Sequence, residues 1–264
     1  MKHQLHTRIR YSEIDENGNL NIVSLINYLQ DCAAFHSDAV GYGLDHLKPQ
    51  HTGWFITNWQ LLILKLPRYG EEITISTWAY SMRGMIAKRN FSIENAAGEP
   101  LVLANSFWVF MDLAAAKPVR IPDADILAYQ VEEGLDLPWG NRKIAPFPEA
   151  AYTSLGSTQV MPVHLDTNHH MNNAYYIEIA RDSLPKGRKI FGIRAEYKKP
   201  AALGDRILIR YAEATPGDGH PRTDASIAAE MARSGFETDC AARTQVLLEN
   251  DEQALFAAVE FWTD

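Results

Sequence analysis

Residues 11–28 (YSEIDENGNLNIVSLINY) and residues 162–179 (PVHLDTNHHMNNAYYIEI) follow one pattern. Each contains Asp-x-Asn, at Asp15 and Asp166, and then a further Asn before a segment that has the periodicity of a helix. The two halves also end alike, because Phe107-Trp108 parallels Phe261-Trp262. The equivalent positions lie 151 residues apart at the first motif and 154 at the last. The sequence therefore predicts a duplicated unit.

In each predicted unit, a short strand precedes one helix and a run of longer strands follows it. We expect the first helix to start at Asn19 or Asn21 and to end at Gly41, and the second to run from about Asn173 to Leu184. One helix packed on several antiparallel strands is an α+β unit. The composition typical of strands occurs at 5–11, 54–66, 72–80, 88–94 and 101–111, and again at 158–163, 191–199, 206–212, 225–232, 243–248 and 254–262.

The boundary between the units is expected where Pro, Gly, Asp and Glu become frequent. We assign residues 1–125 to the first unit, 126–157 to a linker and 158–264 to the second unit. The chain length of 264 residues is sufficient for two compact units of ordinary size.

Composition narrows the class of protein. Apolar residues make up 46% of the chain and charged residues 22%, which is typical of a globular protein, and the net charge of −8 disfavours nucleic-acid binding. Two cysteines, Cys32 and Cys240, favour a reducing compartment. The N-terminus lacks the apolar run of a signal peptide, and no stretch is apolar over the roughly 20 residues that span a bilayer. We expect a cytoplasmic protein that does not insert into membranes.

The segment Asp166-Thr167-Asn168-His169-His170 carries the strongest signal for catalysis. Alternate side chains of an extended segment share a face, so Asp166, Asn168 and His170 are expected to point into one cleft. An imidazole can act as a general base near neutral pH, a carboxylate can fix its tautomer, and the start of the following helix offers free N–H groups for an oxyanion. The alternative is a simple helix cap.

The first unit has Asn19 where the second has His170, which indicates one catalytic unit and one structural unit. Histidines 164, 169 and 170 lack partners at zinc-ligand spacing, and the chain has no glycine-rich phosphate loop and no Gly-x-Ser-x-Gly motif. We therefore expect an enzyme that uses neither a cofactor nor a metal ion.

Several motifs together resemble the bacterial acyl-acyl carrier protein (ACP) thioesterases, a family with a double hotdog fold. They are Asp166-x-Asn168-x-His170-x-Asn172-Asn173, Tyr175-Tyr176-Ile177, Asp15-x-Asn17-Gly18, residues 25–31 (LINYLQD), Trp108-Val109 with Asp112, and residues 117–122 (KPVRIP).

The resemblance implies two tandem hotdog units, each a curved antiparallel sheet around a central helix. It implies hydrolysis of fatty acyl-ACP, which releases free fatty acid and ends chain elongation, with Asp166, Asn168 and His170 as the catalytic set. The sequence departs from the family pattern at Pro200, where a second Glu is expected after Glu196-Tyr197-Lys198-Lys199. We hypothesise that Glu196 supplies the missing carboxylate.

The same resemblance implies that the first unit helps to shape the pocket for the acyl chain. Candidate substrate-binding residues are Trp54, Trp59, Trp78, Met82 and Met85, together with Asn172 and Asn173 beside the catalytic segment. An acidic carrier protein requires local positive charge. The preferred docking residues are Arg181, Lys186, Arg188 and Lys189, with Lys198 and Lys199 as a second patch.

Three other functions stay open. The enzyme could act on acyl-coenzyme A, the scaffold could bind acyl chains without catalysis, or the histidine could serve a dehydratase. Monomer and homodimer are both compatible with the sequence.

Overall fold

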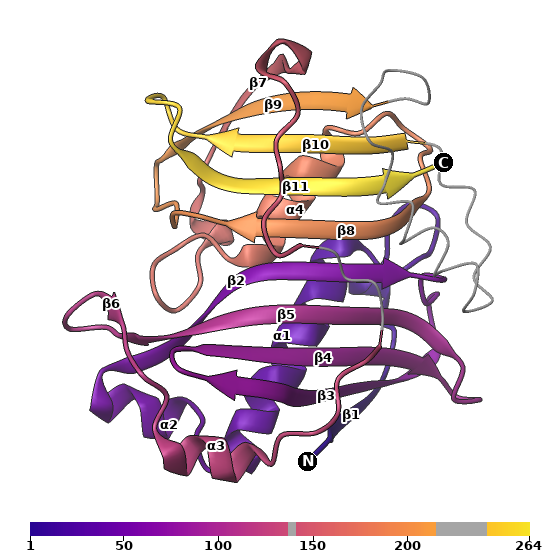
Figure 1. The fold of residues 1–264 in the computed structure, drawn as a ribbon. Coiled ribbons are helices and arrows are strands. Elements are labelled where there is room, and N and C mark those ends of the chain that lie inside the picture. Colours follow the sequence, from indigo (N-terminus) through magenta and orange to yellow (C-terminus); the bar gives the residue numbers. More distant parts are fainter. Residues whose placement is uncertain (137–140, 215–241) are drawn as a thin grey trace. The chain divides into compact units, whose positions relative to one another are not determined.

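The computed structural model describes residues 1–136, 141–214 and 242–264, and the chain divides into two units, Met1–Asp136 and Leu137–Asp264 (Figure 1). The division falls inside the predicted linker. This linker is shorter than expected, because residues 123–129 form a helix of the first unit and a strand of the second unit starts at Thr153. The strand predicted for 225–232 and the residue Cys240 lie outside the described residues.

The first unit is an antiparallel sheet in the order β1-β3-β4-β5-β2, with the short β6 paired to β5. The predicted strands and the long helix are confirmed. The elements are β1 (His3–Arg8), α1 (Ile22–Ala39), α2 (Leu44–Leu47), β2 (Thr52–Ile63), β3 (Glu72–Arg83), β4 (Ile86–Asn95), β5 (Pro100–Asp112), β6 (Lys117–Pro118) and α3 (Asp123–Tyr129).

The second unit repeats this plan with the strand order β8-β11-β10-β9-β7, again antiparallel throughout. Its first strand lies at residues 153–159 rather than 158–163, because Pro162 opens a turn of 3-10 helix. The elements are β7 (Thr153–Gln159), α4 (Asn173–Asp182), β8 (Ile190–Tyr197), β9 (Arg206–Ala214), β10 (Ala242–Glu249) and β11 (Leu255–Thr263).

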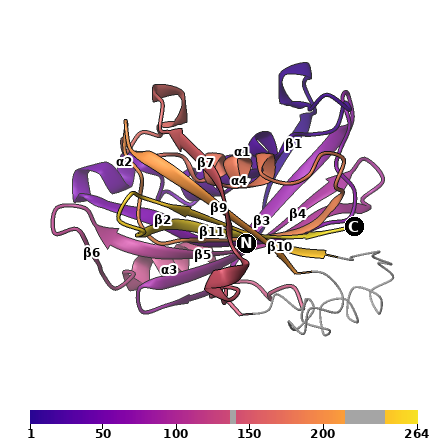
Figure 2. The same ribbon diagram turned by 90° about the horizontal axis from the view of Figure 1, so that it is seen from above.

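Helix α1 forms the core of the first unit and packs on β1 and β3 (Figure 2). Its side chains Leu25, Ile26 and Leu29 are fully buried, as the helical periodicity predicts. The helix begins where the Asn21 side chain accepts the Ser24 N–H at 2.8 Å. Cys32 is also fully buried on this face, and its thiol donates to the Ile75 carbonyl oxygen at 3.5 Å. Among the described residues, no helix combines the length and the apolar character needed to cross a membrane.

Candidate active site

A tight turn before α4 holds the predicted catalytic residues, and one carboxylate organises it. Asp166 Oδ1 accepts the backbone N–H groups of Asn168 at 2.8 Å and of His170 at 3.2 Å. The Asp166 N–H donates to the His170 carbonyl oxygen at 2.8 Å. These bonds fold the segment back on itself, so Asp166, Asn168 and His170 are held together by the backbone of a single turn.

The first unit contains the same turn. Asp15 Oδ1 accepts the N–H groups of Asn17 and Asn19, both at 2.9 Å, and the Asp15 N–H donates to the Asn19 carbonyl oxygen at 2.7 Å. Gly18 adopts a φ of 79° there, and the second unit reaches nearly the same conformation at His169, with a φ of 60°. A left-handed conformation costs a non-glycine residue about 1–2 kcal/mol, so the second turn is strained beside the predicted base.

The imidazole of His170 is half-buried, and within the described part of the chain it makes no hydrogen bond. Asp166 makes no hydrogen bond to this imidazole among the described contacts; its Oδ1 accepts backbone N–H groups and so positions the turn, and a role in fixing the tautomer stays a prediction. The His170 backbone forms a bridge with Ala202, and the Met171 N–H donates to the Ala201 carbonyl oxygen at 2.8 Å. The turn is thus fixed at its backbone, while the ring is left available for a ligand or a water molecule.

Helix α4 starts directly after this turn. The Asn172 side chain accepts the Ala174 N–H at 2.9 Å, so it caps the helix. The Asn173 carbonyl oxygen accepts the hydroxyl of Tyr197, from β8, at 2.9 Å. Asn172 and Asn173 therefore lie at the positive end of the helix dipole, where their described contacts cap the helix and tie it to β8, and their role in substrate binding stays a prediction.

Two tyrosines that sequence reasoning missed hold the helix in place. Tyr176 on α4 accepts the Ala201 N–H at 2.8 Å, and its ring meets that of Tyr197 at 5.6 Å. Burial raises the pKa of Tyr176 to about 12 and that of Tyr197 well above its usual range, so both hydroxyls keep their protons. The sequence Tyr175-Tyr176-Ile177 was visible, but the partners of Tyr176 lie far along the chain.

The structure does not bring Glu196 to the turn. Side chains alternate along β8, and because Tyr197 reaches α4, Glu196 points to the opposite face. There Glu196 Oε2 accepts the Ile144 N–H at 3.0 Å, and Oε1 pairs with Lys198. Figure 1 shows the segment that leads into β7 and helix α4 on opposite sides of the sheet of the second unit. The hypothesis that Glu196 supplies the missing carboxylate is wrong for this reason. Pro200 is exposed.

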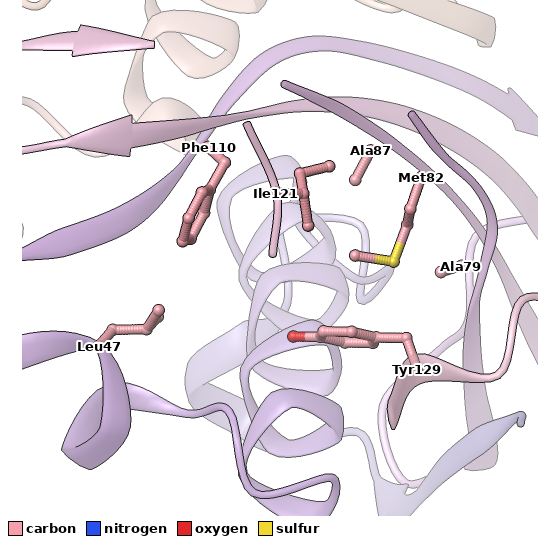
Figure 3. Close-up of a cluster of buried hydrophobic side chains, with 7 residues drawn as sticks. All are labelled: Leu47, Ala79, Met82, Ala87, Phe110, Ile121 and Tyr129. Carbon is pink, nitrogen blue, oxygen red and sulfur yellow. The ribbon is translucent and has the colours of Figure 1, made fainter. Parts of the chain in front are cut away.

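The candidate acyl-chain residues separate into different surroundings in the first unit. Met82 belongs to a cluster of buried side chains that we call the Met82 cluster (Figure 3), and half-buried Trp54 packs on it. Trp59 is fully buried against Phe91, with ring centroids 5.2 Å apart. The Met82 cluster consists of Leu47, Ala79, Met82, Ala87, Phe110, Ile121 and Tyr129.

Of the other two candidates, Trp78 donates to a backbone carbonyl oxygen and Met85 lies near the surface. Trp78 is buried, and its Nε1–H donates to the Glu133 carbonyl oxygen at 2.8 Å. Met85 is 44% exposed. Of the five residues, the structure therefore brings Trp54 and Met82 together in one apolar region.

The predicted docking residues differ in how their charges are neutralised. Arg181 pairs with Asp182 at 2.9 Å, and Arg188 pairs with Glu213 at 2.8 Å. Lys186 and Lys189 are exposed and form no ion pair with a described residue. In the second patch, the Lys198 charge is engaged by Glu196, whereas Lys199 is exposed.

Comparison with known families supports the assignment of both units. Residues 1–129 match the acyl-ACP thioesterase N-terminal domain, and residues 153–260 match the acyl-ACP thioesterase C-terminal domain. The chain therefore belongs to the acyl-ACP thioesterase family.

Relatives and solved structures agree with this. A chloroplast palmitoyl-ACP thioesterase of Arabidopsis thaliana is 27% identical over 207 residues, which cover 72% of this chain and 50% of the relative. The oleoyl-ACP thioesterase 1 of the same plant is 25% identical over 193 residues, which cover 67% of this chain and 53% of the relative. The chain thus spans about half the length of these curated relatives.

Two solved structures share the fold along the whole chain. An acyl-ACP thioesterase from Bacteroides thetaiotaomicron superimposes with a TM-score of 0.80 at 18% identity, covering 100% of this chain and 98% of that one. The 12:0-ACP thioesterase of Umbellularia californica gives 0.78 at 16% identity, covering 100% and 94%. The predicted α+β class with two tandem hotdog-type units is confirmed.

The strain at His169 can be measured directly. We expect His169→Gly to raise the free energy of unfolding by up to about 1 kcal/mol, because glycine adopts the left-handed conformation without a steric penalty. The reciprocal change Gly18→Ala in the first unit should lower it by about 1 kcal/mol. Urea denaturation of both variants checks the prediction. If His169→Gly instead lowered the free energy of unfolding, His169 would not be strained.

Proposed function

We propose that this chain hydrolyses fatty acyl-ACP thioesters, releasing free fatty acid and ending chain elongation. The observation that carries the proposal is the turn anchored by Asp166, which presents His170 and Asn168 at the start of α4. Family membership of both units supports the thioester class, and the relatives named above are palmitoyl- and oleoyl-ACP thioesterases.

In the proposed mechanism, the His170 imidazole takes a proton from a water molecule, whose oxygen attacks the thioester carbonyl carbon. Asn168 and the positive end of the α4 dipole stabilise the negative charge that develops on the carbonyl oxygen. Cleavage of the C–S bond then expels the thiolate, which takes the proton held by His170. Asp166 acts through the backbone, because its two accepted N–H bonds set where His170 and Asn168 lie.

For the acyl chain we propose the apolar region around the Met82 cluster in the first unit. Its members come from α2, β3, β4, β5, α3 and, for Ile121, the segment between β6 and α3, and Trp54 and Trp108 pack against them. Such a set of apolar and aromatic side chains is the kind of surface that buries an aliphatic chain.

The first test removes the proposed base. His170→Ala should lower kcat on an acyl-ACP substrate by about 10²–10⁴-fold, the range expected for loss of general-base catalysis. The neighbouring His169→Asn provides the matched control, because asparagine tolerates the left-handed conformation and should leave kcat within about twofold. An active His170→Ala enzyme would remove the assignment.

A second test separates structure from catalysis by using the duplication. Asp166→Ala and Asp15→Ala each delete two backbone hydrogen bonds from equivalent turns, so each should lower the free energy of unfolding by about 1–2 kcal/mol. Only Asp166→Ala should lower kcat at a temperature where both proteins are folded. A similar loss of kcat in Asp15→Ala would contradict a division into one catalytic and one structural unit.

A third test concerns the carrier. Lys186 and Lys189 have no carboxylate partner among the described residues, so we propose that they face the acidic carrier protein. The double variant Lys186→Glu/Lys189→Glu should raise KM for acyl-ACP severalfold and leave KM for the same acyl group on coenzyme A unchanged. Lys117→Glu, an exposed change in the first unit, is the control. If wild-type enzyme prefers the coenzyme A substrate, the acyl-CoA alternative replaces this proposal.

A non-catalytic acyl-binding protein is the second candidate. It is favoured by the position of Glu196, whose carboxylate serves Ile144 and Lys198 instead of the turn. Fatty acyl binding without any turnover of thioesters by the wild-type chain would support it.

A further inference from the structure

A second histidine, His164, lies at the base of the turn that Asp166 closes. It belongs to the single turn of 3-10 helix Pro162–His164, directly before that turn. Its N–H donates to the Met161 carbonyl oxygen at 2.9 Å, and its own carbonyl oxygen accepts the Asn172 N–H at 2.8 Å. The backbone of His164 therefore connects the segment that enters the turn with the residue that caps α4 after it.

The imidazole of His164 adds a hydrogen bond that the ring can accept only while it is neutral. Nδ1 accepts the Met161 N–H at 3.1 Å, so this nitrogen carries no proton and the proton of the neutral ring is on Nε2. The ring packs on the Tyr175 ring of α4, with the ring centroids 4.9 Å apart. One side chain thus fastens the segment before the turn and contacts the helix that follows it.

The first unit makes the same fastening with a carboxylate, because Glu13 lies 151 residues before His164, the separation of the two turns. Glu13 Oε2 accepts the Arg10 N–H at 2.8 Å, and Oε1 accepts the Arg10 Nε–H at 2.7 Å. The Tyr28 hydroxyl donates to Oε2 at 2.6 Å. Burial acts to raise the pKa of Glu13, but these hydrogen bonds outweigh burial and the pKa is lowered. The carboxylate therefore stays an acceptor at neutral and mildly acidic pH.

The imidazole in the second unit titrates much closer to neutrality. Burial lowers the pKa of His164 from its ordinary value of 6.5. Tyr175 is the titratable side chain that the structure records against the ring, and within the described part of the chain no charged side chain pairs with it. A protonated Nδ1 cannot accept the Met161 N–H. The stability that this bond contributes is thus fully present above about pH 6.5 and is lost as the pH falls through the lowered pKa.

We propose that His164 is a positioning residue of the candidate site: its neutral imidazole fastens the base of the turn and so sets where His170 and Asn168 lie. Acidification then lowers turnover in two ways, because it protonates the proposed base and also releases the turn that carries it. The effect on turnover rests on the proposed function. The fastening of the turn does not, since it requires no hydrolysis.

The first test replaces the titratable acceptor by one that does not titrate. In His164→Gln, the amide oxygen can accept the Met161 N–H at every pH, as glutamine does in a capping box. The ratio of the wild-type kcat to that of the variant, on one acyl thioester, should be near 1 at pH 8 and fall at least about threefold by pH 5.5. The titration of His170 occurs in both proteins and cancels in this ratio. For His169→Asn, which removes an exposed neighbouring histidine, the ratio should not change with pH.

The second test uses the wild-type protein alone, so it does not depend on the folding of a variant. Amide exchange measured by NMR gives protection factors for the N–H groups of Asn168 and His170, which Asp166 binds, and for the equivalent Asn17 and Asn19. Between pH 7.5 and pH 5.5 we expect protection to fall at least about threefold in the second turn and to stay constant in the first.

The two measurements decide separate points. Equal behaviour of the two turns in the exchange experiment would overturn the proposal, and so would a kcat ratio that does not change with pH, because His164 would then hold the turn without positioning the reaction. A wild-type chain that hydrolyses no thioester, but loses protection in the second turn alone, would remove the proposed function and leave the fastening by His164 in place.

Discussion

The candidate site depends on one carboxylate that accepts two backbone N–H groups. Asp166 closes the turn before α4 in this way, and Asp15 closes the equivalent turn before α1. A carboxylate used like this sets the path of the backbone and leaves the side chains of the turn free to differ. The two units could therefore keep one scaffold while a single position holds Asn19 in one and His170 in the other. Within one turn, the aspartate sets the path of the backbone, and the residue four positions later is free to supply the chemistry.

Alternation along β8 divides the second unit into two chemically different faces. Tyr197 ties the start of α4 to the sheet, while Glu196, the preceding residue, holds the segment that leads into β7 through Ile144. On that outer face Glu260 also binds both Arg194 and Arg243, so the sheet is covered by a network of buried ion pairs. The polar residues of β8 on this face thus stabilise the segment that leads into β7 rather than the candidate site.

Local signals predicted much of this molecule, and long-range contacts did not follow from them. The duplicated turn, the helix start at Asn21 and most strands were visible because capping and periodicity are properties of neighbouring residues. The position of Glu196 was not predicted because its partner Ile144 lies 52 residues away in the sequence. The hydroxyl of Tyr176 and the meeting of Arg89 with His36 join residues far apart in sequence, which no single-sequence pattern reports.

The buried thiol on α1 gives the first unit an internal reporter. Burial raises the pKa of Cys32 to about 12, and the sulfur is shielded by the sheet, so alkylating reagents cannot reach a thiolate while the helix is docked. In a chain whose other cysteine has been replaced, labelling of Cys32 would report the opening of this unit alone. With a fast reagent the labelling rate equals the opening rate, and with a slow reagent it is proportional to the fraction of molecules that are open. Cys32, which completes the apolar face of α1, therefore makes the local opening of the first unit observable without an added probe.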